Sequence, residues 1–222
     1  MNSPHTTLPL LGDDDDDDDD DENGDDGDEH RKPKKPKETP EFLGKSLLDQ
    51  RVIMVCKPVD RDMAAVIVAQ LLVLDHKDGK APITMYVNCP GGDADSGFGI
   101  YDAMHFISAP ITTVCLGLAA SAAVTIFVGG TRGRRFTLPH SRFLIHQPSS
   151  QSQGQASDIE ITANEIIKTR DLYNQILAEE TGKSDKTILR DVSRDFWLSA
   201  KEAVEYGLAT KIIESVGELN HA

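Results

Sequence analysis

Short apolar runs alternate with longer amphipathic segments from about residue 51 to the end of the chain. Apolar runs bounded by Pro, Gly or Asp predict strands at 51–56, 83–88, 111–115, 143–146 and 208–213. Apolar residues at helical spacing predict helices at 63–74, 96–107, 157–181 and 200–206, and a further helix that starts near residue 121. Strands that alternate with helices through short turns indicate an α/β domain with a largely parallel sheet. In such sheets the loops at the carboxyl ends of the strands form the functional site.

One polar side chain interrupts the apolar segment 114–124, in which a β-branched strand runs into a series of small residues around Ser121. Packing alone does not explain a hydroxyl at the start of an apolar helix. Two other isolated polar residues lie downstream: His146 ends the predicted strand at 143–146, and Asp195 precedes an aromatic pair. A serine nucleophile, a histidine base and an orienting acid are the parts of a serine hydrolase. These three residues are therefore the first candidates for a catalytic site.

The charge of the chain is unevenly distributed. The 222 residues suit one domain, and of the formal net charge of −14, residues 1–41 carry −11. An unbroken Asp run followed by a basic, Pro-rich stretch predicts a disordered tail over 1–41 and a folded domain over 42–222. The folded part is close to neutral, so its charge gives no reason to expect nucleic-acid binding.

Several classes of protein are not supported by the sequence. No apolar run reaches the length of a membrane span, and the N-terminus has neither a signal core nor the basic character of a transit peptide, so we expect a cytoplasmic protein without a membrane partner. Neither GKS segment, at 44–46 or 182–184, has the upstream glycine of a P-loop. The chain therefore does not hydrolyse a nucleotide by that route.

The cysteines and histidines do not suggest a metal site. Cys56, Cys89 and Cys115 lack a Cys-x-x-Cys spacing and lie in apolar, strand-like contexts, which predicts reduced, buried thiols rather than disulfides or zinc ligands. His140 and His146 have no acidic residue at metal-binding spacing. We therefore expect no bound metal.

Seven segments in order along residues 48–213 together carry a specific resemblance. They are IVAQLL (67–72), YVNCPGG (86–92), GIYDAM (99–104), GLAAS (117–121), SRFLIHQP (141–148), QGQASDIE (153–160) and RDFWLSA (194–200). With these segments the chain resembles the proteolytic subunit of the Clp protease, a family of serine peptidases. The resemblance implies a ClpP/crotonase-like fold, a spiral of βαβ units with a protruding handle helix.

The resemblance also implies roles for single residues. Ser121 matches the family's nucleophile, His146 its base and Asp195 the acid that orients the base. Asp191 also follows an Arg, but the position directly before Phe196 favours Asp195. The backbone N–H groups of Gly92 and Ala122 match the family's oxyanion hole. The substrate backbone would pair as an added strand between two segments, and the corresponding substrate-binding residues are Asp93, Ala94, Gln153, Gly154 and Gln155.

By the same resemblance, the long helix at 157–181 is a handle through which two heptameric rings stack around a chamber. The implied partners are other copies of this chain, a hexameric AAA+ unfoldase of the ClpX or ClpA/ClpC type, and unfolded protein substrates. The partner ATPase would use ATP, and this chain would need no cofactor of its own.

Two alternatives remain open at this point, and one departure from the family changes the predicted specificity. The alternatives are a non-catalytic ring subunit of the same complex and a crotonase-like acyl-CoA enzyme, which shares the spiral fold and a two-donor oxyanion hole. The departure is Asp93-Ala94-Asp95, where relatives are mostly apolar or small. Ala94 and Ala122 predict a roomier pocket that prefers large apolar residues before the cut.

Overall fold

The computed structural model describes residues 40–149, 151 and 153–221. The predicted tail over 1–41 lies outside these residues except for its last two, which begin the helix α1 (Pro40–Asp49). No helix in the described part of the chain is long and apolar enough to cross a membrane.

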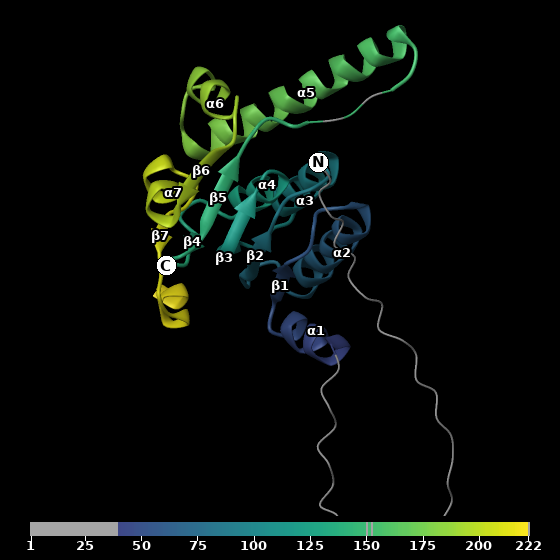
Figure 1. The fold of residues 1–222 in the computed structure, drawn as a ribbon. Helices are drawn as coiled ribbons and strands as arrows, with labels where there is room; N and C mark the ends of the chain where they lie inside the picture. The colour runs from purple at the N-terminus through teal and green to yellow at the C-terminus, as the bar shows by residue number, and fades with distance from the viewer. Residues whose placement is uncertain (1–39, 150, 152, 222) are drawn as a thin grey trace, which may run out of the picture. The chain divides into compact units, whose positions relative to one another are not determined.

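The strands of the described residues form one mixed sheet, which Figure 1 shows at the centre of the fold. They are β1 (Val52–Val55), β2 (Ile83–Cys89), β3 (Ile111–Ala120), β4 (Arg135–Thr137), β5 (Arg142–Ile145), β6 (Phe196–Ser199) and β7 (Lys211–Ile212). The order β1-β2-β3-β4-β7 is parallel throughout, β5 pairs in parallel with β3, and β6 pairs antiparallel with β5. The largely parallel sheet predicted from the alternating pattern is therefore present.

Strand β3 is twice as long as the sequence pattern predicted, because it changes partner along its length. Residues 113–115 pair with β4 and residues 118–120 pair with β5. Between them, Gly117 has φ 116°, and its N–H donates to Ser141 Oγ at 3.0 Å. A left-handed backbone at this point suits glycine and lets one strand serve two neighbours.

All five predicted helices are found near their expected positions. They are α2 (Arg61–Lys77), α3 (Ala94–Phe106), α4 (Ala122–Val128), α5 (Ala156–Thr181) and α7 (Ala200–Tyr206). Polar caps fix the starts of α2 and α7: the Asp60 carboxylate accepts from Met63 N–H at 2.8 Å, and Ser199 forms a capping box with Glu202. The pairs α2 with α3, α3 with α4 and α4 with α5 are in contact, so the helices form a continuous layer.

Helix α5 is buried only at its C-terminal half. Its buried residues are Tyr173, Asn174, Ile176 and Leu177, whereas residues 156–161 are all exposed. Figure 1 shows the N-terminal half extending past the elements that cover the rest of the helix. The helix ends at Gly182, whose αL conformation (φ 72°) is typical of a C-cap.

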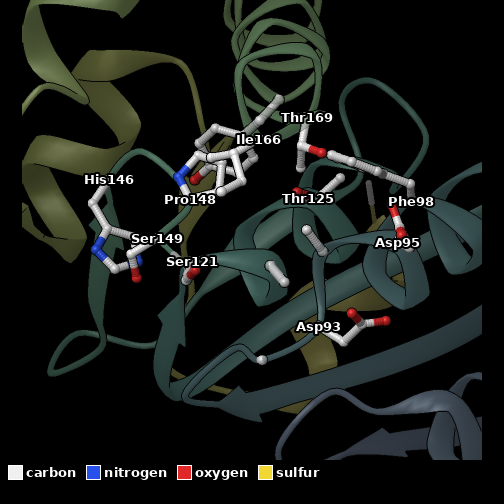
Figure 2. Close-up of a pocket in the computed structure, with 14 residues that line it drawn as sticks. Asp93, Asp95, Phe98, Ser121, Thr125, His146, Pro148, Ser149, Ile166 and Thr169 are labelled. Atoms are coloured by element: carbon white, nitrogen blue, oxygen red, sulfur yellow. The ribbon is translucent and has the colours of Figure 1, made fainter. Parts of the chain in front are cut away.

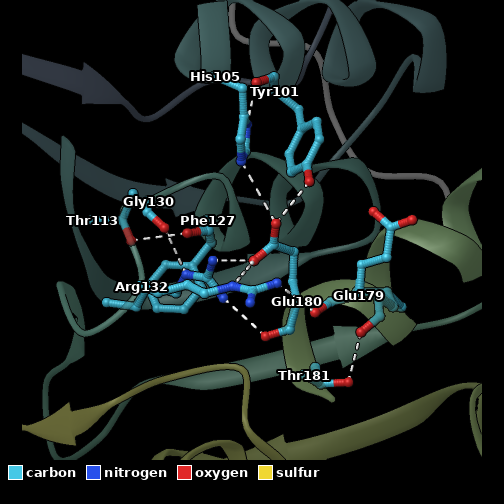
Figure 3. A network of polar contacts seen from close by, with 11 residues as sticks. Tyr101, His105, Thr113, Phe127, Gly130, Arg132, Glu179, Glu180 and Thr181 are labelled. Carbon is cyan, nitrogen blue, oxygen red and sulfur yellow. Dashed lines mark hydrogen bonds and ion pairs between the residues drawn. The ribbon is translucent and has the colours of Figure 1, made fainter. Parts of the chain in front are cut away.

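A buried ionic network ties the C-terminal end of α5 to the sheet (Figure 3). The side chains of Glu180 and Arg135 are only 6% and 4% exposed and form an ion pair. Tyr101 donates to Glu180 at 2.8 Å, and Arg132 and His105 lie 3.6 Å from the same carboxylate. Burial by itself would raise the pKa of Glu180, but the hydrogen bond and charge of Arg135 hold it below its usual value.

Several elements differ from the predictions. The sequence pattern did not predict α1, β4, α6 (Asp185–Asp191), β6 or the 3₁₀ helix η1 (Val216–His221), and the last strand is two residues long rather than six. Cys89 and Cys115 are free and buried as predicted, but the prediction for Cys56 was wrong because Cys56 is exposed. It follows β1 at the edge of the sheet, where one side of the strand has no neighbour.

Candidate active site

Strand β5 brings the three candidate catalytic residues together. Ala120 at the end of β3 pairs with Leu144 of β5, so Ser121 and His146 follow neighbouring parallel strands at the same edge of the sheet. On the other side of β5, Ile145 pairs with Phe196 of the antiparallel β6. Asp195, which precedes β6, therefore lies beside His146, which follows β5. The register alone places residues 121, 146 and 195 at one point of the fold.

Ser121 occupies a strained backbone position at the junction of β3 and α4. Its φ and ψ are 55° and −126°, a region that non-glycine residues rarely adopt, and its N–H donates to Leu144 O at 2.8 Å. The neighbouring turn leaves no space for a side chain, since a Cβ on Gly91 would lie 2.5 Å from Ala120 O and 2.8 Å from Ser121 Cβ. The sharp turn presents the hydroxyl at the end of the strand, a placement that also occurs in the strained nucleophile turns of α/β-hydrolases.

His146 is oriented by Asp195 and not by Asp191. His146 Nδ1 lies 3.1 Å from Asp195 Oδ1, so the other ring nitrogen, Nε2, is left for a substrate or a nucleophile. The Asp191 side chain is 8% exposed and is held elsewhere, by Arg190 at 2.8 Å and by the Tyr206 hydroxyl at 2.9 Å. Asp191 is thus a structural carboxylate on α6.

Two backbone N–H groups near Ser121 have no partner among the described residues. Gly92 forms a parallel bridge in which Val59 N–H donates to Gly91 O and Asp93 N–H donates to Val59 O, both at 2.8 Å. The N–H of Gly92 therefore points to the opposite side, away from Val59. Ala122 is the first residue of α4, and a first-turn N–H has no partner within its own helix. Both residues line the same cavity as Ser121.

This cavity has a volume of about 310 Å³ and joins residues from four parts of the chain. Figure 2 shows His146 and Ser121 at one end, and Asp95, Phe98 and Thr169 at the other. The lining residues are Gly92, Asp93, Ala94, Asp95, Phe98, Ser121, Ala122, Thr125, His146, Pro148, Ser149, Ile166, Thr169 and Tyr173. Burial raises the pKa of the Tyr173 phenol, so the phenol stays protonated at neutral pH.

The structure brings only some of the predicted substrate-binding residues to this cavity. Asp93 and Ala94 line it directly beside Gly92. Gln153, Gly154 and Gln155 are exposed, form no strand, and lead into the N-terminal end of α5 without lining the cavity. That these three residues pair with the substrate backbone, as the second of the two flanking segments, stays a prediction.

Sequence reasoning did not identify the far wall of the cavity. Phe98, Thr125, Ile166 and Thr169 lie inside helices, where their spacing resembles that of ordinary core positions. Thr125 could have been noticed, because it is the one polar side chain of α4, in an otherwise apolar segment just after Ser121.

The comparisons with known proteins agree with this arrangement. A family model described as Clp protease matches residues 37–216. A solved structure of a ClpP1 mutant from Listeria monocytogenes is 37% identical, with a TM-score of 0.74, and the match covers 80% of this chain and 99% of that chain. The chain therefore belongs to the Clp protease family.

Within that family the chain is a ClpP-type protease subunit. The predicted family and the spiral α/β fold are confirmed, and the crotonase-like alternative is set aside. Membership implies assembly into a barrel-shaped oligomer that works with a partner ATPase.

Proposed function

We propose that this chain is a serine endopeptidase that hydrolyses unfolded proteins to short peptides with Ser121, His146 and Asp195. The observation that carries the proposal is the register of β5, which has the end of β3 on one side and the start of β6 on the other. A nucleophile on a strained turn, a histidine bonded to a carboxylate and two free N–H donors then meet at one cavity. These are the parts that acyl transfer requires.

Each group has a defined role in the proposed reaction. His146 Nε2 removes the Ser121 proton as Oγ attacks a peptide carbonyl, and the oxyanion accepts hydrogen bonds from the N–H groups of Gly92 and Ala122. His146 then protonates the leaving amine. Water hydrolyses the acyl-enzyme by the reverse sequence, while the Asp195 carboxylate accepts the hydrogen bond from Nδ1 and keeps the imidazole oriented.

The proposed setting of this chemistry is a closed chamber in the cytoplasm, formed by two stacked heptameric rings. The exposed N-terminal half of α5, with Ile159 and Ile161 at its surface, offers an apolar face for stacking. A hexameric AAA+ unfoldase would supply unfolded substrate and consume the ATP, and this chain would need no cofactor. Nucleic acid and membranes are not among the proposed partners.

Active-site labelling tests the proposal. A fluorophosphonate probe added to the assembled protein should label one serine per chain, and the Ser121→Ala variant should show no labelling. The same preparation should cleave short peptides, and cleavage of a folded protein should require the ATPase and ATP. Labelling at a different serine would contradict the assignment of Ser121.

A specific observation supports the second candidate, a non-catalytic ring subunit. Within the described residues, the Ser121 hydroxyl makes no hydrogen bond, so the bond from Ser121 to His146 is not formed in this single chain. Catalytic hydrogen bonds are often long before substrate binds, and we therefore favour the enzyme. Absence of labelling in the assembled, ATPase-bound particle would support the structural role instead.

A further inference from the structure

We propose that Asp95 makes the active-site cavity select a lysine or arginine side chain on the substrate residue whose carbonyl Ser121 attacks. The inference rests on the proposed function and adds a substrate class to it. With the carbonyl oxygen at Gly92 and Ala122, the adjoining side chain enters the cavity that these two residues line.

The charges around the cavity have one sign. Its lining includes the carboxylates of Asp93 and Asp95 but no Lys or Arg, and His146 is its one further titratable group besides the Tyr173 phenol. A cavity lined by one sign of charge attracts the opposite charge.

The two carboxylates differ in what they already bind. Asp93 caps α3: it accepts from Ser96 N–H at 2.9 Å and from the Ser96 hydroxyl at 2.5 Å, and the hydroxyl bond, against a smaller opposing effect of burial, holds the pKa of Asp93 below its usual value. Asp95 makes no hydrogen bond or ion pair with any described residue. Asp95 is therefore the carboxylate that is free to bind a cation from the substrate.

A second, independent feature of the cavity points to a polar ligand. Thr125 is 1% exposed and lines the cavity, and its hydroxyl oxygen has no hydrogen-bond partner in the part of the chain that the structure describes. An unpaired buried hydroxyl costs free energy that a bound donor would recover. A lysine ammonium or an arginine guanidinium offers donors and no acceptor, which suits both this oxygen and the Asp95 carboxylate.

The walls between Ser121 and Asp95 match the stem of such a side chain. Phe98, Ile166 and Tyr173 supply apolar surface, and Figure 2 shows Asp95 beside Phe98 at the end of the cavity away from His146. Lys and Arg bury their methylene stems along apolar surface while the charged end remains in a polar place. Ala94 and Ala122 predicted a preference for large apolar substrate residues before the cut. This preference is refined here: the cavity accepts a long apolar stem, and its far end prefers a positive charge.

Arg61 is a cation of this chain that would compete with the substrate cation for these carboxylates. It borders a separate shallow hollow together with Asp93 and Asp95, and its charge contributes to the low pKa of Asp93, but it forms no ion pair with either carboxylate. Removing this charge should strengthen the selection.

Peptides that differ at one position test the inference on the assembled full-length protein. Three fluorogenic peptides carry Lys, norleucine or Glu before the cleaved bond, and norleucine retains the lysine stem without its charge. We expect kcat/KM to fall in the order Lys, norleucine, Glu. Asp95→Asn should lower the Lys-to-norleucine ratio about fivefold, as expected for one partly exposed ion pair, and Arg61→Gln should raise the ratio.

Asp102→Asn is the matched control, because it removes the same charge from an exposed position on the same helix, outside the cavity. Its Lys-to-norleucine ratio should equal that of the wild type. An unchanged ratio in Asp95→Asn, or an equal fall in Asp102→Asn, would overturn the inference.

Two further outcomes separate this inference from the proposed function. If norleucine peptides are cleaved and Ser121 is labelled, but Lys gives no advantage, the inference fails and the protease assignment stands. If no peptide is cleaved and Ser121 is not labelled, the proposed function itself fails. If Asp95→Asn does not fold, raising the salt concentration with the wild type should still lower the Lys-to-norleucine ratio, and a constant ratio would refute the role of charge.

Discussion

His146 Nδ1 lies 3.1 Å from Asp195 Oδ1, although the two residues are 49 positions apart in the chain. The Asp195 side chain is 64% exposed in the single chain, and that of His146 is 30% exposed. An exposed polar contact of this kind contributes little to stability by itself, so the antiparallel pairing of β5 with β6 must hold these groups in place. The contact is therefore a consequence of the sheet and a means of orienting the imidazole.

Replacing Asp195 should impair catalysis and leave the fold intact. We expect Asp195→Asn to lower kcat by about 10²- to 10⁴-fold, because the amide no longer favours the tautomer in which Nε2 accepts the serine proton. Steady-state peptide hydrolysis measures kcat, and chemical denaturation should give a stability near that of the wild type.

The neighbouring carboxylate provides the matched control. Asp191→Asn weakens contacts with Arg190 and Tyr206, so it should lower the free energy of unfolding by about 1–3 kcal/mol while kcat changes little. If Asp191→Asn lost activity and Asp195→Asn kept it, the two roles would be reversed.

The strained backbone at Ser121 should lower the stability of the protein. Its φ of 55° is unfavourable for a residue with a Cβ, so Ser121→Gly should be more stable than Ser121→Ala by about 1 kcal/mol, after the entropy of the unfolded glycine is allowed for. Both variants should be inactive. Thermal unfolding of the two proteins side by side is the measurement, and a less stable glycine variant would show that the turn carries no strain.

Gly92 should tolerate no side chain. A Cβ at this position would lie 2.2 Å from Val59 O, so Gly92→Ala must displace the backbone that carries a proposed oxyanion donor. We expect kcat/KM to fall by at least about 10²- to 10³-fold. Peptide hydrolysis and circular dichroism together distinguish lost activity from lost folding.

Gly99→Ala is the control for the Gly92 substitution. Gly99 lies in α3, and a Cβ added there would meet no other atom within 4 Å, so the alanine should stabilise the helix by roughly 0.5–1 kcal/mol and leave activity unchanged. Equal losses in the two variants would mean that Gly92 has no special role.

The buried Glu180 should make stability depend on acid pH. Because its pKa is lower in the folded than in the unfolded protein, the folded state binds fewer protons, and stability rises with pH. This contribution is fully present above the unfolded pKa, near 4.3, and is lost as the pH falls through the folded pKa. Urea unfolding at a series of pH values should show this decline for the wild type.

Glu180→Gln should remove that pH dependence and leave Arg135 buried without its charge partner. We expect the substitution to lower the free energy of unfolding by about 3 kcal/mol at pH 7. Below pH 7, the stability of the variant should change less with pH than that of the wild type. Glu179→Gln, at the exposed neighbouring position, should change neither quantity. A Glu180→Gln protein as stable as the wild type would indicate that the network contributes no net stabilisation.

The sequence pattern determined the elements whose stability is local. Helices α2 and α5 were predicted within a few residues, because amphipathic spacing, the Asp60 cap and the Gly182 stop are all encoded nearby. Strands β1, β2 and β5 were predicted because buried parallel strands are continuous apolar runs. The motif segments also indicated the family and identified Ser121, His146 and Asp195 as candidate catalytic residues.

Tertiary structure decided what depends on distant partners. Strands β4 and β6 are three and four residues long and exist through their pairing with β3 and β5, which no local pattern encodes. Asp191 and Asp195 have different roles because they have different neighbours: Asp191 accepts from the Tyr206 hydroxyl, whereas Asp195 contacts His146. The cavity joins Asp95 of α3, Thr125 of α4 and Thr169 of α5, and only the packing of these helices brings their side chains together. Local sequence thus specified the pieces and their chemistry, whereas long-range register and packing determined which groups meet.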